Sequence, residues 1–204
     1  MEYCKELIAG KLRRWERYLA EYRLPAWDEI PEMGLYMEQV IQYLKKHLDY
    51  LPPELKEEQF ITAATINNYV RKKVMPEPVT KKYYRLHLAY LIMICTLKHS
   101  LSIPTLQTVI PADLSEEEMR RTYESYVYRQ QVTTRYFVEE VGAGAAKILD
   151  MEAGKLAAED TEQLIISLAI VSGLSRLAAE KLLLLEGKDL SNGGSIEPRR
   201  PAAD

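Results

Sequence analysis

The fold is decided by a stretch of the sequence at residues 84–100, YRLHLAYLIMICTLKHS. Its apolar residues recur at helical spacing and occupy almost every side of the helix. A helix that is apolar all round is buried on several sides, so we expect this one to form the core of its domain. Around it the hydrophobic pattern is helical, glycine is scarce at 9 residues, and strand-like segments are hard to find. The sequence therefore predicts an all-α protein.

Further helices are expected on both sides of this core helix. They cover residues 2–23, 35–51 and 62–75 before it and, after it, about 103–111, 115–150 and 159–186. Thr62 is a plausible N-cap, and Ser115 with Glu118 fits a capping box. A break is expected at Gly173.

Composition restricts the class of protein. With 204 residues, 47% hydrophobic and 28% charged, the chain has the composition of a soluble globular protein. The sequence contains no run of about 18 uncharged apolar residues and no signal-peptide pattern, so we expect a cytoplasmic protein without a membrane span. Cys4 and Cys95 are too few for a disulfide scaffold. The three histidines have no metal-ligand spacing, so neither a cofactor nor an enzymatic activity is expected.

Charge is unevenly distributed along the chain. The formal net charge is −3, yet residues 62–100 carry seven Lys or Arg and a single acidic residue, Glu77. The flanking segments are both acidic. A basic island in an acidic protein suits a local contact with a polyanion. The alternative interpretation is a solvated helix face with neutralising neighbours.

The helix predicted at the start of this basic island has two different faces. Ile66, Val70 and Val74 fall on one side of it, and Asn68 and Lys72 fall on the opposite side. A DNA-recognition helix needs this division, because the apolar side anchors it while polar side chains reach base edges and phosphates. An ordinary surface helix would also have a polar face, but paired asparagines are poor helix formers.

Two resemblances follow from the motifs in this region. Residues 65–69, TINNY, then Val74-Met75-Pro76 and Leu88-Ala89-Tyr90-Leu91 resemble the winged helix-turn-helix of MerR-type regulators. Lys73 stands where that family has a glycine, and Thr80 stands where its wing has an aromatic residue.

A closer resemblance covers about residues 24–106. The motifs LPAW (24–27), LYMEQVI (35–41), INNYV (66–70) and KKY (81–83) are similar to a bacterial family called domain of unknown function 1836. That family is thought to carry a MerR-like DNA-binding fold, so the resemblance implies DNA binding here.

The predicted organisation follows. Residues 1–34 form an N-terminal helix and linker, 35–111 a MerR-like helix-turn-helix domain with a possible small wing, 112–187 a helical dimerisation or effector domain, and 188–204 a disordered tail. The predicted DNA-binding residues are Thr65, Asn67, Asn68, Tyr69, Arg71, Lys72, Lys73, Lys81, Lys82, Tyr83 and Arg85.

The predicted function is that of a sequence-specific transcriptional regulator of double-stranded DNA. It is expected to act as a homodimer, with a small-molecule effector as a further partner. Two alternatives stay open: a helical protein-interaction module that does not bind DNA, and a small-molecule sensor.

Overall fold

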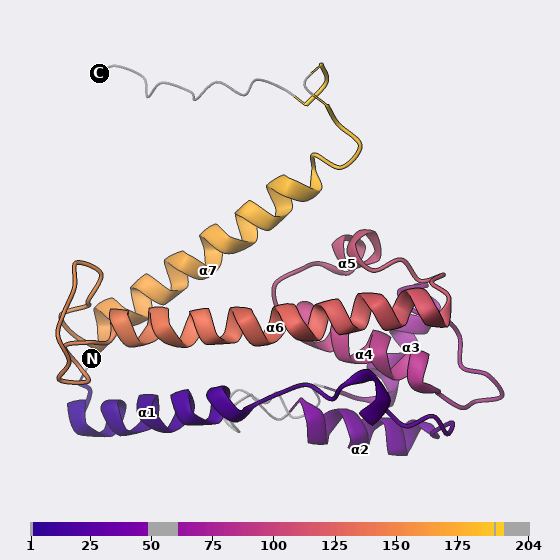
Figure 1. The fold of residues 1–204 in the computed structure, drawn as a ribbon, viewed down its shortest axis with the longest axis horizontal. Coiled ribbons are helices and arrows are strands. Elements are labelled where there is room, and N and C mark those ends of the chain that lie inside the picture. The colour runs from indigo at the N-terminus through magenta and orange to yellow at the C-terminus, as the bar shows by residue number, and fades with distance from the viewer. Residues whose placement is uncertain (1, 49–60, 190, 194–204) are drawn as a thin grey trace.

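The computed structural model describes residues 2–48, 61–189 and 191–193. In chain order its elements are α1 (Lys5–Glu21), the short 3-10 helix η1 (Trp27–Glu29), α2 (Met37–His47), α3 (Ala63–Arg71), α4 (Arg85–Leu97), α5 (Ile103–Val109), α6 (Glu116–Gly144) and α7 (Thr161–Leu183). Within the described residues, β-pairing is limited to two isolated bridges. The all-α prediction is therefore confirmed (Figure 1).

Helix α4 is the centre of the larger hydrophobic core, as its composition predicts. Each residue from Leu88 to Ile94 is at most 3% exposed. Helices α2 and α6 pack directly on α4. Apolar residues of α3 and α5, with Ile66 and Leu106 fully buried, complete the same core. The shared core, together with direct packing on α2, positions the short α3.

The larger core extends beyond residues 35–111 in both directions. Leu24, Trp27 and Ile30 belong to it on the N-terminal side. On the C-terminal side, Met119 and Tyr123 of α6 are fully buried in it. The segment before α2 and the first part of α6 are therefore structural parts of this domain.

Helix α6 connects the larger core to a smaller one. Ser115 caps α6 and forms the expected capping box with Glu118. Further along, α1 lies beside α6, with Trp15 packed edge-on against Phe137 at 5.6 Å between ring centres. The turn after α6 then forms the smaller core with Ala9 of α1 and Leu164 of α7 (Figure 1).

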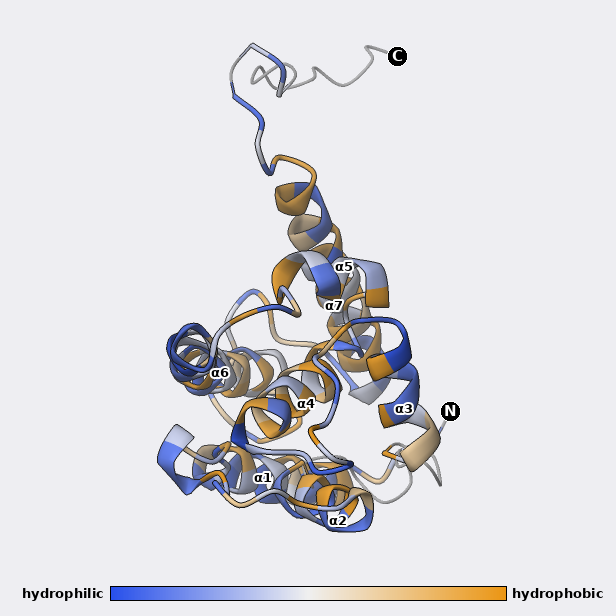
Figure 2. Ribbon diagram, turned by 90° about the vertical axis from the view of Figure 1, so that its right-hand side faces the viewer, coloured by the Kyte–Doolittle hydropathy of each residue, from blue (hydrophilic) through white to orange (hydrophobic). Residues whose placement is uncertain are grey.

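Helix α7 diverges from α6 and is mostly uncovered (Figures 1 and 2). It continues through Gly173, so the expected break at that residue is wrong. By length and composition alone, α7 could cross a membrane, and only 6% of its apolar window is buried inside the protein. The sequence pattern had predicted no such span. Most of the tail predicted at residues 188–204 lies outside the described residues.

Candidate nucleic-acid interface

Helix α3 is held by its start and by its apolar face. The Thr62 side chain caps it, because Oγ1 accepts a hydrogen bond from the N–H of Thr65 at 3.1 Å. Ile66 and Tyr69 are buried against the core. Asn67 on another side is exposed, whereas Asn68 is half-buried. The helix therefore presents a polar side to solvent, as the sequence predicts.

The end of α3 adopts a Schellman motif. The N–H of Lys73 donates to the carbonyl of Val70, and the N–H of Val74 donates to that of Tyr69, both at 2.9 Å. Lys73 has a φ of 54° there, in the left-handed region that favours glycine. Gln107 of α5 donates from Nε2 to the carbonyl of Lys72 at 2.8 Å. A lysine is thus held in a backbone conformation that disfavours it, at the edge of the polar side of α3.

Replacing Lys73 by glycine is expected to raise the free energy of unfolding by up to about 1 kcal/mol, because the left-handed conformation disfavours side chains with a Cβ atom. Urea denaturation measures the effect. The control is Lys72→Gly, one residue earlier, where φ is −81°. There glycine should destabilise by about 0.5–1 kcal/mol. Equal destabilisation by both variants would contradict the assigned backbone strain.

A second polar element, the wing, follows α3. We use this name for residues 79–82, which form a tight turn with backbone hydrogen bonds between Val79 and Lys82 in both directions at 3.0 Å. Thr80 and Lys81 have φ values of 50° and 63°, as a two-residue hairpin turn requires. Strained residues of this kind cluster at functional sites, which makes the wing a candidate contact element.

The wing is attached to the segment before α2. Leu35 and Tyr83 exchange two backbone hydrogen bonds, at 2.8 and 2.9 Å. Gly34 allows this close approach, since a Cβ atom on it would lie 2.8 Å from Cζ of Tyr84 and 2.9 Å from Cβ of Lys82. Lys82 Nζ lies 5.2 Å from the centre of the Tyr36 ring. These contacts fix the wing relative to α2.

Five cations lie on α3 and the wing. Arg71, Lys72, Lys73 and Lys81 are exposed, and Lys82 is half-buried. Arg71 donates to Oδ1 of Asn68 at 2.9 Å. Among the residues that the structure describes, none of the five forms an ion pair with a carboxylate. Elsewhere in the described ranges, ion pairs with carboxylates are formed by Lys5, Arg23, Arg85, Arg120, Arg121, Lys147 and Arg176.

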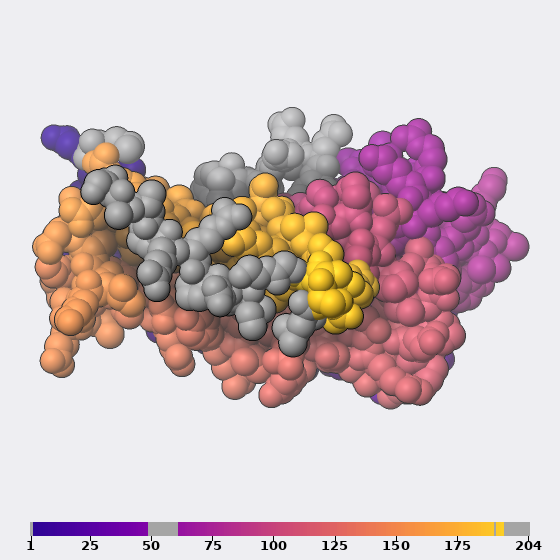
Figure 3. Space-filling model, turned by 90° about the horizontal axis from the view of Figure 1, so that it is seen from above, coloured from indigo at the N-terminus to yellow at the C-terminus, as the bar shows by residue number. Residues whose placement is uncertain are grey.

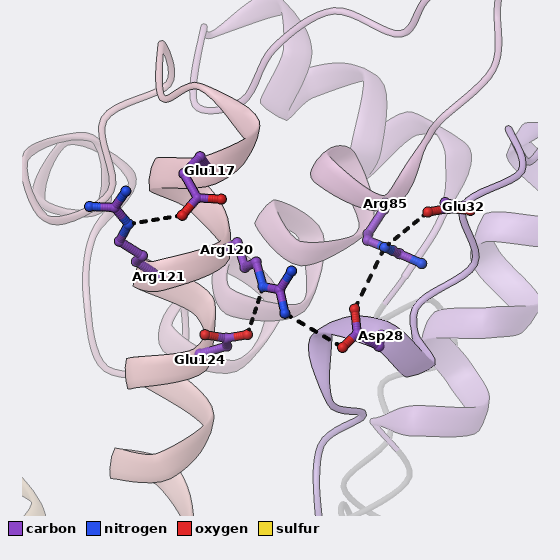
Figure 4. A network of polar contacts seen from close by, with 7 residues as sticks. All are labelled: Asp28, Glu32, Arg85, Glu117, Arg120, Arg121 and Glu124. Atoms are coloured by element: carbon purple, nitrogen blue, oxygen red, sulfur yellow. Dashed lines mark hydrogen bonds and ion pairs between the residues drawn. The ribbon is translucent and has the colours of Figure 1, made fainter.

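Arg85 lies outside this cationic surface, contrary to its predicted role as a phosphate contact. Its side chain is 14% exposed and forms ion pairs with Asp28 at 3.9 Å and Glu32 at 3.4 Å (Figure 4). It also donates from Nε to the carbonyl of Ile30 at 2.9 Å and lies over the Trp27 ring. Arg85 therefore ties α4 to the segment before α2.

Tyr69 and Tyr83 are also placed inside the fold, each 3% exposed. Burial raises the pKa of both phenol groups. These two tyrosines and Arg85 are consequently removed from the candidate interface. The interface retains Thr65, Asn67, Asn68, Arg71, Lys72, Lys73, Lys81 and Lys82.

The buried His87 supports the loop that leads from α3 to the wing. Its Nδ1 accepts from the N–H of Tyr84 at 3.1 Å, and its Nε2 lies 2.9 Å from the carbonyl of Glu77. Both ring nitrogens are thus occupied within the protein. Among the described residues, no group of three His, Cys, Asp or Glu side chains could hold a metal ion. Burial raises the pKa of Cys95 to about 12, which leaves its thiol uncharged.

Sequence reasoning missed three supporting residues, Gly34, Tyr36 and Gln107. Each acts across at least 34 residues of sequence: Gly34 and Tyr36 on the wing, and Gln107 on the end of α3. The glycine in a glycine-poor segment was the only available signal, because helical periodicity carries no information about contacts between distant segments.

Comparison with known proteins gives one match. A family model described as "Domain of unknown function (DUF1836)" matches residues 25–130, which is just over half of the 204 residues. No curated protein and no solved structure matches the chain. The matched range includes η1, all buried residues of the larger core except Leu24, and the first half of α6.

Proposed function

We propose, from the premise that the chain belongs to the family called domain of unknown function 1836, that its matched domain binds double-stranded DNA as a sequence-specific regulator. The observation that carries the proposal is the set of five cations on α3 and the wing, which have no carboxylate partner among the described residues. Unneutralised cations favour a phosphate backbone, because binding releases the counterions condensed on DNA.

In this proposal α2 and α3 act as a MerR-like helix-turn-helix, and α3 enters the major groove. Asn67, Asn68 and Thr65 contact base edges, where asparagine pairs with adenine through two hydrogen bonds. The hydrogen bond from Arg71 holds the Asn68 amide in one orientation, with its NH₂ group turned away from the guanidinium. A fixed amide loses less conformational entropy on binding.

The lysines of the wing contact the phosphates beside the groove. Lys81 at the wing tip and Lys82 next to it set the position of the domain on the duplex without reading the sequence. The bridge between Leu35 and Tyr83 keeps the wing at a fixed distance from α2. Because the wing is tied to the core, contacts made by its lysines also orient α3.

Replacing Lys81 and Lys82 together by alanine is expected to weaken binding to all DNA sequences. It should also make the negative slope of log K against log salt shallower by up to about two. Fluorescence anisotropy with fragments selected from genomic DNA, between about 50 and 200 mM salt, measures both quantities. The matched control is Lys11→Ala with Arg14→Ala, which removes two exposed charges from α1.

The control variant should keep the affinity and the slope of the unmodified protein. The proposal fails if the unmodified protein retains no DNA in dilute buffer, or if its binding does not depend on salt. An equal loss of DNA affinity in both double variants would show that net charge, and not the surface of α3 and the wing, governs binding.

A further inference from the structure

Helix α7 exposes more apolar surface than any other part of the described chain. Of its apolar residues, Leu164 is buried and Leu168 is half-buried against the smaller core. Figure 3 shows α7 at the surface, with the yellow C-terminal part of the chain lying over the face seen from above. Nine large apolar side chains on and directly after α7 are each at least 48% exposed: Ile165, Ile166, Ile170, Val171, Leu174, Leu177, Leu182, Leu184 and Leu185.

The size of this surface matches that of a protein interface. If each of the nine side chains exposes roughly 100 Å², their total of about 900 Å² is slightly larger than the area that one partner buries in a standard interface, about 800 Å². A monomer rarely leaves contiguous apolar patches beyond about 300–600 Å² uncovered. The area therefore indicates a partner.

One stripe on α7 has the spacing of a helix pair. Ile166, Ile170, Gly173, Leu177 and Leu184 follow one another at intervals of four, three, four and seven residues, and Glu180 occupies the heptad position between the last two. This is the heptad pattern that packs one helix on another. The stripe lies on the side of α7 opposite Leu164 and Leu168, which contact the chain's own core. One side of α7 thus packs on the smaller core of its own chain, and the opposite side is exposed to solvent.

A lipid bilayer fits this helix less well than a protein does. The charge-free run from Leu164 to Ser175 has 12 residues, which gives about 18 Å of helix against a hydrocarbon thickness of about 30 Å. Arg176, Glu180 and Lys181 follow within the helix. Arg176 and Glu180 pair at 3.2 Å on the helix surface, an arrangement suited to the aqueous edge of an interface.

We propose that α7 pairs with the α7 of a second copy of this chain through the stripe Ile166, Ile170, Gly173, Leu177 and Leu184. A second copy supplies the same stripe, and a twofold arrangement covers both stripes at once. Gly173, at the middle of the stripe, has no side chain, so the two helix backbones can approach each other closely there.

The test is the mass of the full chain in solution without DNA, measured by sedimentation equilibrium at tens of micromolar. The chain should sediment at twice its mass of 23.5 kDa. Ile170→Glu with Leu177→Glu should sediment as a monomer with unchanged helical circular dichroism. The control is Leu156→Glu, because Leu156 is 74% exposed in the loop before α7. This variant should remain dimeric.

A mixing experiment keeps the test valid if the Ile170→Glu, Leu177→Glu variant does not fold alone. Mixing it with Ile170→Lys, Leu177→Lys chains should restore the dimer, in either orientation of the helices, because both substituted positions then meet opposite charges. A monomeric unmodified chain overturns the proposal, as does a dimeric glutamate variant. An unmodified chain that is monomeric alone and binds phosphatidylcholine vesicles would identify a membrane as the occupant. These measurements contain no DNA, so they succeed or fail independently of the DNA-binding proposal.

Discussion

Replacing Tyr123 by alanine is expected to lower the free energy of unfolding by about 3–5 kcal/mol, the range for large aromatic side chains in a core. The Tyr123 side chain is fully buried. Its ring lies 6.1 Å from that of Trp27, and its hydroxyl donates to the carbonyl of Pro25 at 2.8 Å. The substitution thus leaves both a cavity and an unpaired buried carbonyl.

Urea denaturation of three variants separates these contributions. Tyr123→Phe keeps the ring and removes the hydroxyl, so it should cost only about 1–2 kcal/mol. Tyr128→Ala removes a ring of the same size from the same helix, but this ring is 62% exposed. Its effect should stay within about 0.5 kcal/mol. A small effect of Tyr123→Ala would mean that α6 folds separately from the larger core.

Replacing Arg85 by alanine is expected to destabilise the protein by about 2 kcal/mol, through lost packing on Trp27 and the lost hydrogen bond to Ile30. Its ion pairs with Asp28 and Glu32 add little, because both carboxylates are largely exposed. Arg85→Lys should not restore the stability, since an ammonium group does not stack on the indole and reach three oxygens together.

Thermal denaturation of Arg85→Ala tests the expected loss of stability, and DNA titration of this variant tests whether Arg85 contributes to binding. The DNA affinity of the folded fraction should stay unchanged, because the Arg85 side chain is held by Asp28 and Glu32 (Figure 4). Arg121→Ala is the control: Arg121 is also paired with a carboxylate, Glu117, but its side chain is 73% exposed. That variant should lose less than about 0.5 kcal/mol. A specific loss of DNA binding by folded Arg85→Ala would return Arg85 to the interface.

Local sequence signals predicted much of the fold. The cap at Thr62, the capping box at Ser115 and the burial of α4 all depend on residues within a few positions of one another, so the sequence was sufficient to predict them. The polar side of α3 was predicted for the same reason. The left-handed backbone at Lys73 was not predicted, although this lysine stands where the MerR-type family has a glycine.

Contacts between distant segments could not be predicted in this way. A helical wheel shows which residues share a face, but the neighbouring segments decide whether that face is exposed to solvent. Tyr69 was assigned to DNA because it stands where MerR-type regulators have a phosphate-contacting tyrosine, and Arg85 was assigned as a further phosphate contact. In the structure Tyr69 is buried in the core and Arg85 pairs with Asp28. Likewise, the contact between Tyr123 and Pro25 joins residues 98 positions apart.

The unbroken course of α6 has a mechanical consequence. Its 29 residues form a rod of about 44 Å at 1.5 Å per residue. One end is anchored in the larger core by Tyr123, and the other passes into the smaller core at Ala145. The two cores are therefore held at a fixed distance by a continuous helix. In the proposed pair of chains joined through α7, these rigid helices would hold the two α3 helices at one separation. If α3 binds DNA as proposed, the pair would accept only half-sites with the matching spacing.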